Sequence, residues 1–248
     1  MSEPGAGPVP GGPQQASVPE GLVTAVVNLV KTGPVLLGAY TIAELTAVDA
    51  VVDFLEARPS DEVLAEAVRS LAARQLLVPG SDSDQVQVRG DLGIAVAFEQ
   101  RARTVLDARV TGTGPGEPWR VLLLPQPEQI CLQYRIDALG VHEIGLYQLD
   151  QALEFLASWL PRGPRADPDP ATNPDRLLGS AERSALVTVT RYTTQGSAEI
   201  AGASTDLILA RYDGRLHVLA RDPEDQAKVI VSPHDGKDIR AMIEDLLT

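Results

Sequence analysis

Histidine is scarce in this chain. Its three histidines, His142, His217 and His234, lie far from any second histidine, cysteine or pair of carboxylates at metal-ligand spacing. His142 and His217 occupy similar places in two related parts of the sequence, each in the third strand of a short series. The simpler interpretation is that each is a structural residue of a strand, whose ring has a polar edge. The alternative is that it titrates or binds a ligand. We therefore predict no metal site.

The chain has a single cysteine, Cys131, which excludes an internal disulfide. Cys131 lies within an apolar stretch that is typical of a strand, where a free cysteine usually behaves as a small buried hydrophobe. We expect a structural rather than a catalytic role for it. A chain without paired cysteines also favours a reducing compartment.

Other residues with reactive side chains lack the neighbours that catalysis needs. Four serines have no nucleophile elbow and no nearby base in the sequence: Ser158, Ser180, Ser184 and Ser204. The glycine-rich stretch 112–116 is followed by no Lys-Ser/Thr pair, so it does not predict a phosphate loop. Four aspartates surround expected turns, where local hydrogen bonds favour this residue type: Asp206, Asp213, Asp222 and Asp225. We expect no catalytic residue, no cofactor and no enzymatic activity.

Composition limits the partners of the protein. The 248 residues carry a formal net charge of −13, which repels nucleic-acid backbones and anionic membranes. Residues 1–15 lack the basic and apolar regions of a secretory signal, and no apolar run approaches the roughly 20 residues that span a bilayer. We expect a cytoplasmic protein that binds neither nucleic acid nor membrane. The preference for Arg over Lys, with abundant Ala, Gly and Pro, suggests a GC-rich genome.

The elements that must position any site occur twice. The first copy is a β-meander at 119–124, 129–135 and 141–147, followed by an amphipathic helix that ends near residue 160. The second copy has strands at 186–192, 205–212, 215–221 and 227–231, followed by a helix over 233–247. This repeat predicts an α+β fold, in which a central antiparallel sheet carries a quasi-twofold duplicated β-meander plus helix. The predicted parts are a disordered tail at 1–19, a first half at 20–162, a linker at 163–179 and a second half at 180–248.

A helical subdomain is expected before the first meander. The β-branched run at 22–30 favours a strand, with a short buried helix as the alternative. Thr41 and Glu44 fit a capping box that begins a helix, with an apolar series at Ile42, Leu45, Val48, Val52 and Leu55. Ser60 is expected to cap the next helix, whose buried stripe is Val63, Leu64, Ala67, Val68 and Leu71.

The remaining segments are expected to connect these parts. We predict a polar, mobile connection at 80–90, two successive strands over 91–110, a hairpin-type loop at 111–118 and a proline-rich linker at 163–174. Ser232 and Pro233 suit the N-cap and first position of the last helix, whose apolar face is Ile239, Met242, Ile243, Leu246 and Leu247.

Two binding modes follow from this organisation. The two helices over 41–73 and a following β pair have the order of a winged helix, which makes a DNA-associated regulator the alternative function. The second helix, 61–74, carries acidic as well as basic residues, which argues against groove binding. A protein-binding module would instead present a sheet face and the loops 80–90 and 111–118. We expect Trp119 and Trp159 to be buried in the core, although tryptophan is also enriched at interfaces.

From about residue 22 to residue 247 the pattern resembles the EspG family, the cytosolic chaperones of type VII secretion. The resemblance rests on the duplicated meander plus helix, on Leu71-Ala72-Ala73-Arg74-Gln75-Leu76-Leu77 after the early helices, and on Asp213-Gly214-Arg215-Leu216 before the terminal helix. It implies a quasi-twofold antiparallel sheet with helical subdomains. It also implies a non-enzymatic chaperone or adaptor that binds the apolar tip of a helical, PE–PPE-like secretion substrate and keeps it soluble until export. The oligomeric state stays open.

Overall fold

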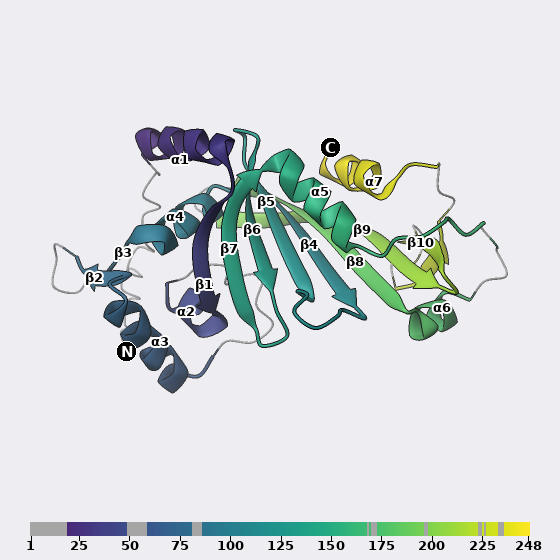
Figure 1. Cartoon of the computed structure of the whole chain (residues 1–248), viewed down its shortest axis with the longest axis horizontal. Helices are drawn as coiled ribbons and strands as arrows, with labels where there is room; N and C mark the ends of the chain where they lie inside the picture. The colour runs from purple at the N-terminus through teal and green to yellow at the C-terminus, as the bar shows by residue number, and fades with distance from the viewer. Residues whose placement is uncertain are drawn as a thin grey trace, which may run out of the picture.

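The protein is described by a computed structural model, which covers residues 19–48, 59–80, 86–167, 169, 173–195, 198–222, 225, 227–232 and 236–248. Its centre is a nine-stranded antiparallel sheet with the order β1–β7–β6–β5–β4–β8–β9–β10–β11 (Figure 1). The bounds of these strands, in chain order, are Val35–Thr41 for β1, Thr104–Thr111 for β4, Arg120–Pro125 for β5, Ile130–Ile136 for β6, Val141–Gln148 for β7, Arg183–Gln195 for β8, Ala198–Tyr212 for β9, Arg215–Arg221 for β10 and Val229–Val231 for β11.

Around this sheet lie helices and a separate small hairpin. The hairpin pairs β2 (Leu77–Pro79) with β3 (Val86–Val88). The helices are α1 (Glu20–Thr32), α2 (Ile42–Ala47), α3 (Asp61–Ala73), α4 (Gly90–Glu99), α5 (Leu149–Trp159), α6 (Pro174–Ser180) and α7 (Ile239–Leu247). The predicted α+β class with a helical N-terminal region is therefore confirmed. None of the helices in this described part has the length and apolarity that a membrane crossing requires.

Eight of the nine strands form two halves of the same topology, and β1 pairs with β7 at the outer side of the first half. β4 and β8 pair along their length at the centre, from Thr104↔Arg191 to Thr111↔Ser184. From this pair the chain runs outward through β5, β6 and β7 in one half, and through β9, β10 and β11 in the other. Each half ends in a helix, α5 or α7, and these two helices contact each other (Figure 1). The quasi-twofold arrangement was thus predicted, but each half has four strands, and β4 was not recognised as part of the first copy.

One face of the sheet is covered by α5 and α7 and is called here the α5 face. Alternate residues of the central strands point into this layer, as the two-residue period of a strand requires. The layer joins both halves, because Leu106 and Val121 of the first half belong to the same buried cluster as Val187 and Leu209 of the second. The two halves therefore share one core, and neither buries its apolar face alone.

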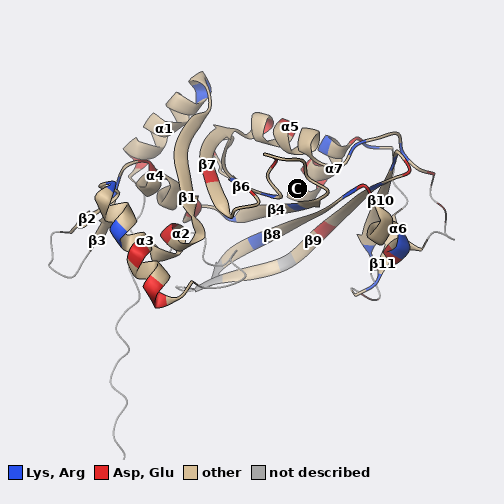
Figure 2. Ribbon diagram, turned by 60° about the horizontal axis from the view of Figure 1, so that its bottom comes forward, with Lys and Arg blue, Asp and Glu red and all other residues tan. Residues whose placement is uncertain are grey.

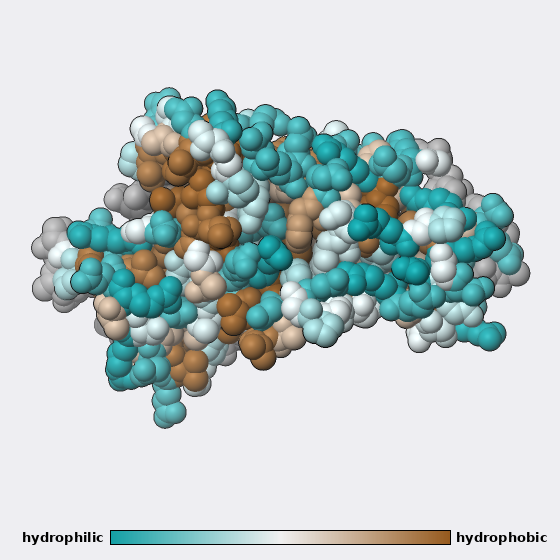
Figure 3. All heavy atoms as spheres, in the orientation of Figure 1, coloured by the Kyte–Doolittle hydropathy of each residue, from teal (hydrophilic) through white to brown (hydrophobic). Residues whose placement is uncertain are grey.

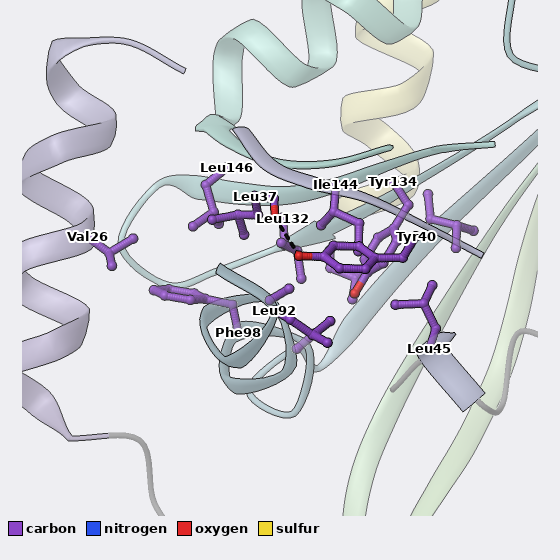
Figure 4. Packing of buried hydrophobic residues seen from close by; sticks show 14 of the residues in the cluster. Val26, Leu37, Tyr40, Leu45, Leu92, Phe98, Leu132, Tyr134, Ile144 and Leu146 are labelled. Carbon is purple, nitrogen blue, oxygen red and sulfur yellow. Dashed lines mark hydrogen bonds between the residues drawn. The ribbon is translucent and has the colours of Figure 1, made fainter. Parts of the chain in front are cut away.

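The opposite face, called here the α6 face, carries two separate apolar clusters. Under α1, α2 and α4 lie Leu37, Tyr134 and Leu146, together with Phe98 of α4 (Figure 4). Under α6, Leu177 packs on a smaller cluster that includes residues of β9 and β10. Between these two clusters, the α6 face of β4 and β8 carries polar as well as apolar side chains.

Two predictions in the N-terminal region were wrong. Residues 22–30 form most of α1, a helix rather than the favoured strand. Its buried residues, Val23, Val26, Val27 and Val30, follow the spacing of one helix face, and packing of that face outweighs the β preference of valine. Residues 91–110 form α4 and then β4 instead of two strands. α4 is apolar on all sides, so its sequence shows no period that would distinguish it from a strand.

The helix caps were predicted better than the helix faces. The Thr41–Glu44 capping box begins α2, and Ser60 caps α3 as expected. The apolar series of the first helix continues to Val52 and Leu55, which lie outside the described residues. On α3 only part of the expected stripe is buried. Val63 and Val68 are exposed, because α3 contacts the rest of the fold along a narrower face.

The last helix and the connecting segments also differ from the predicted bounds. The last helix begins at Ile239 after the N-cap Asp238, not at Pro233, because the Asp238 side chain accepts the hydrogen bond of Ala241 N–H. Its expected apolar face packs under the sheet as predicted. The connection 80–90 contains β3, the loop 111–118 joins β4 to β5 as a hairpin, and the stretch 163–179 ends in α6. The expected tail at 1–19 lies outside the described residues, except for Pro19.

Candidate binding site

A cross-strand ion pair marks the centre of the α6 face. Arg120 of β5 donates from Nε and Nη2 to the two carboxylate oxygens of Asp107 on β4, at 2.9 and 2.8 Å. Arg109, two residues along β4, donates to the same carboxylate at 3.1 and 3.2 Å. Arg109 and Arg120 are direct cross-strand neighbours, so their positive charges would repel without Asp107. Since Arg120 is only 5% exposed, the Asp107 carboxylate compensates a buried positive charge.

A second carboxylate lies in the same row of cross-strand neighbours, which runs from Asp107 over β8 to Asp206. Asp107 faces Thr188 on β8, and Thr188 faces Asp206 on β9. The Thr188 hydroxyl donates to Asp206 Oδ1 at 2.8 Å, and Arg221 of β10 forms an ion pair with Oδ2. Both carboxylates are therefore engaged as acceptors, which suits holding strands together better than proton transfer. Asp206 was expected beside a turn, but it lies within β9, far from the β9–β10 turn at Asp213.

Beside this row is a cavity of about 480 Å³, built from both halves of the sheet. Its apolar walls include Trp119 before β5, Leu178 of α6, Leu186 of β8 and Ile208 of β9. Polar groups on its lining are the guanidinium groups of Arg109 and Arg221 and the hydroxyls of Thr111 and Ser184. Its size falls within the range of small ligand pockets, and such pockets form preferentially where two structural units meet.

The hydroxyls of this cavity are not arranged for nucleophilic catalysis. Ser184 Oγ lies 2.7 Å from Thr111 Oγ1, across the β4–β8 pair. The described lining residues include no histidine, cysteine or lysine that would activate either hydroxyl. An apolar cavity with a few polar groups on its rim is suited to accept apolar side chains of a partner.

A second cavity, of about 510 Å³, lies on the other side of the molecule between α5, the segment 162–165 and the start of α7. Both acidic and basic side chains line this second cavity. Arg240 of α7 forms ion pairs with Asp150 and Glu154 of α5 and with Glu244 of its own helix. These pairs connect α5 with α7, so we interpret this cavity as part of the packing between the two helices.

Cys131 has the predicted structural environment. It is fully buried on β6 within the core under α5, and burial raises the pKa of its thiol to about 12. A thiol with so high a pKa is almost fully protonated at neutral pH and is a poor nucleophile. The sequence-based interpretation of Cys131 as a buried hydrophobe is confirmed.

The histidines are not equivalent, contrary to the prediction. His142 lies on β7, the last strand of its half, whereas His217 lies on β10, the third strand of the other. His142 is buried with Nδ1 3.0 Å from the Gly140 carbonyl oxygen. Burial lowers the pKa of His142, and the charge of Arg120 lowers it further, while the Gly140 carbonyl opposes the shift. Burial and Arg215 likewise lower the pKa of His217. His234 lies outside the described residues.

The other candidate side chains serve local structure. Ser158 donates to the Phe155 carbonyl oxygen, and Ser204 Oγ lies 3.1 Å from Thr190 Oγ1. Trp159 is buried in the core under α5, as expected, whereas Trp119 is half-buried and lines the cavity of the α6 face. Within the described ranges, no three His, Cys, Asp or Glu side chains are grouped closely enough to hold a metal ion.

The Asp107–Arg109–Arg120 cluster was missed by sequence analysis. The alternation of Asp107 and Arg109 with apolar residues was the available signal, because it places both on one face of a strand. Their pairing with Arg120 depends on strand register, which the sequence does not reveal. Comparison of the sequence with models of known protein families and with functionally characterised proteins finds no match.

Proposed function

We propose that this protein is a non-enzymatic chaperone or adaptor, which binds the apolar tip of a helical PE–PPE-like protein and keeps it soluble until type VII secretion. The observation that carries the proposal is the apolar cavity at the junction of the two sheet halves. A cavity of about 480 Å³ accommodates one or two large apolar side chains. Such side chains at the tip of a helical bundle would aggregate if they were left in water.

The surroundings of the cavity support recognition of a protein. Its walls stand on paired strands, which hold Leu186 and Ile208 in fixed positions. A rigid wall reduces the conformational entropy that binding must otherwise overcome. Trp119, which is half-buried, offers a large apolar surface to a partner.

Co-expression tests the proposal. We expect a PE–PPE heterodimer from the same genome to stay soluble with this chain and to elute with it near 1:1 from a sizing column. Thr111→Trp places an indole at the cavity without changing the core, because Thr111 is exposed. It should weaken the complex by at least about tenfold. Thr205→Trp, at an exposed strand position outside the cavity lining, is the matched control and should bind normally.

Two outcomes would contradict the proposal. A heterodimer that precipitates, or that elutes apart from the folded chain, would remove the chaperone function. Equal binding by the Thr111→Trp and Thr205→Trp proteins would leave a complex but place its interface away from the cavity.

A DNA-associated role is the second candidate. The order of α2, α3 and the β2–β3 hairpin resembles that of a winged helix, and this order motivates the test. Arg69 of α3, however, pairs with Glu66, and Arg74 at the C-cap of α3 pairs with Glu44 of α2. DNA would have to displace these carboxylates. Salt-dependent binding of duplex DNA would support the role, and a flat titration at low ionic strength would remove it.

A further inference from the structure

We propose that the outer edge of β1 is the interface of a homodimer, in which β1 of one copy pairs antiparallel with β1 of a second copy. This surface is distinct from the cavity of the α6 face. The inference therefore goes beyond the proposed function and does not depend on it.

β1 is the end strand of the nine-stranded sheet. Its inner edge pairs with β7 from Val35↔Leu146 to Thr41↔Val141, and no described strand pairs with its outer edge. The seven residues of β1 include no proline and no charged side chain. Natural edge strands are usually protected from unwanted pairing by such residues. A bulge between Leu36 and Gly38 bends β1 but adds no charge, so among the described residues no charged side chain of this strand opposes pairing.

Apolar side chains are exposed on β1 and on the helix that leads into it. Leu36 of β1 is 64% exposed and Leu29 of α1 is 54% exposed. Figure 3 shows hydrophobic surface gathered over α1 and the adjoining part of β1. Burying such leucine side chains on association is favourable, because it removes apolar surface from water. Pairing at β1 would remove part of this apolar surface from water.

The charge distribution identifies a second copy as the partner. Residues 21–43, which contain most of α1 and all of β1, include no Asp or Glu and a single Lys, although the chain has 34 acidic residues. Figure 2 shows α1 and β1 almost entirely without charge, while acidic residues gather on α3. Two chains of net charge −13 repel where their acidic surfaces meet, and this neutral region lets them approach. A strongly basic partner would be attracted to the acidic surfaces instead.

The geometry of pairing limits the assembly to two copies. An antiparallel β1–β1 contact uses the same edge on both copies, so it is isologous and closes after one association step. The opposite end of the sheet is β11, which has three residues and pairs with β10 over its whole length. We therefore expect a closed dimer and no fibre.

Sedimentation of the full chain tests the proposal. Between about 1 μM and 1 mM, the wild type should change from monomer to dimer. Leu36→Glu places two carboxylates at the paired edge and should raise the dissociation constant at least tenfold. Leu139→Glu is the matched control, since Leu139 is 87% exposed in the β6–β7 turn, and its dimerisation should be unchanged. A wild type that stays monomeric throughout, forms higher polymers, or dimerises no better than Leu36→Glu would overturn the proposal.

Thiol cross-linking locates the contact. Because Cys131 is fully buried, a cysteine introduced on the surface is the reactive thiol of the folded protein. Ala39→Cys on exposed β1 should form covalent dimers with a short bismaleimide, and adding Leu36→Glu should suppress them. Leu139→Cys should stay monomeric. Equal cross-linking at Ala39 and Leu139 would contradict an interface at β1.

Discussion

Arg74, the C-cap residue of α3, lies with its Nη1 3.0 Å from Oε1 of Glu44 on α2, and this pair connects the two helices. Glu44 also accepts hydrogen bonds from Ser70 Oγ and from the backbone N–H of Thr41. The Arg74 guanidinium lies 5.0 Å above the ring of Tyr40 on β1. One carboxylate, only 6% exposed, thereby connects two helices to the edge strand.

Removing the charge of Glu44 should loosen this region. We expect Glu44→Gln to lower the free energy of unfolding by about 1–3 kcal/mol, because the hydrogen bonds of a buried carboxylate are replaced by weaker ones. Glu66→Gln is the control, since Glu66 pairs with Arg69 at an exposed site and should contribute at most about 1 kcal/mol. Urea titration followed by circular dichroism measures both, and equal stabilities would show that the Glu44 cluster contributes little.

Stability should fall in two steps on acidification. Burial alone would raise the pKa of Glu44, but the hydrogen bonds from Thr41 and Ser70 and the charge of Arg74 outweigh it and leave the pKa lowered. A carboxyl group whose pKa is lowered on folding stabilises the protein above its unfolded pKa, near 4.5, and this stabilisation is lost as the pH falls through the folded value. Burial first, and Arg120 in addition, lower the pKa of His142, so the unfolded state binds a proton at this residue more readily, and the free energy of unfolding declines as the pH falls below the unfolded pKa of 6.5.

His142→Asn should separate the two steps. The variant should show a smaller decline below pH 6.5, where the lowered pKa of His217 still contributes, and it should keep the decline that begins near pH 4.5. Unfolding midpoints in urea, measured from pH 7.5 to pH 4, provide the comparison. An unchanged decline just below pH 6.5 would assign it to another group.

Two buried tyrosines of the same cluster should respond oppositely to loss of the hydroxyl. Tyr40 donates a hydrogen bond to the Leu37 carbonyl oxygen at 2.9 Å, whereas the buried Tyr134 hydroxyl has no partner among the described residues (Figure 4). Tyr40→Phe should cost about 1 kcal/mol, and Tyr134→Phe should be neutral or stabilising by up to about 1 kcal/mol. Thermal melting of both variants tests this, and a destabilised Tyr134→Phe protein would show that its hydroxyl is satisfied.

The N-terminal helices also show where prediction from sequence reached its limit. The caps of α2 and α3 were predicted correctly, because a capping residue acts on backbone groups two or three positions away. α1 was mistaken for a strand, because it contains four valines and valine prefers strands. Only the packing of those valines against Phe98 and Leu146 decides in favour of a helix, and that packing is tertiary.

The candidate site was less predictable than the repeat that builds it. The repeat appears in the sequence because alternation and helical spacing are local patterns. Strand β4 was not assigned to the repeat, since eight non-strand residues, 112–119, separate β4 from β5. The cavity and the Asp107–Arg120 pair depend on which strands become neighbours and in what register, and no local pattern specifies either.

The Asp107–Arg120 pair should be important for stability. Asp107→Asn leaves the buried guanidinium of Arg120 without its carboxylate, and the expected loss is about 3–5 kcal/mol. Asp150→Asn is the control, because Asp150 is highly exposed and its pair with Arg240 should be worth at most about 1 kcal/mol. Chemical denaturation of both proteins tests the difference. Similar losses would mean that the cross-strand pair contributes no more than a surface pair.

Hydrogen exchange of the chain, alone and with a co-expressed PE–PPE heterodimer, tests the central claim most directly. If the cavity on the α6 face receives the helical partner, amides in the β4–β5 loop and in α6 should become protected, while those of α7 on the opposite face should not change. Protection confined to α7, or no protection in a stable complex, would contradict a binding site at the junction of the two sheet halves.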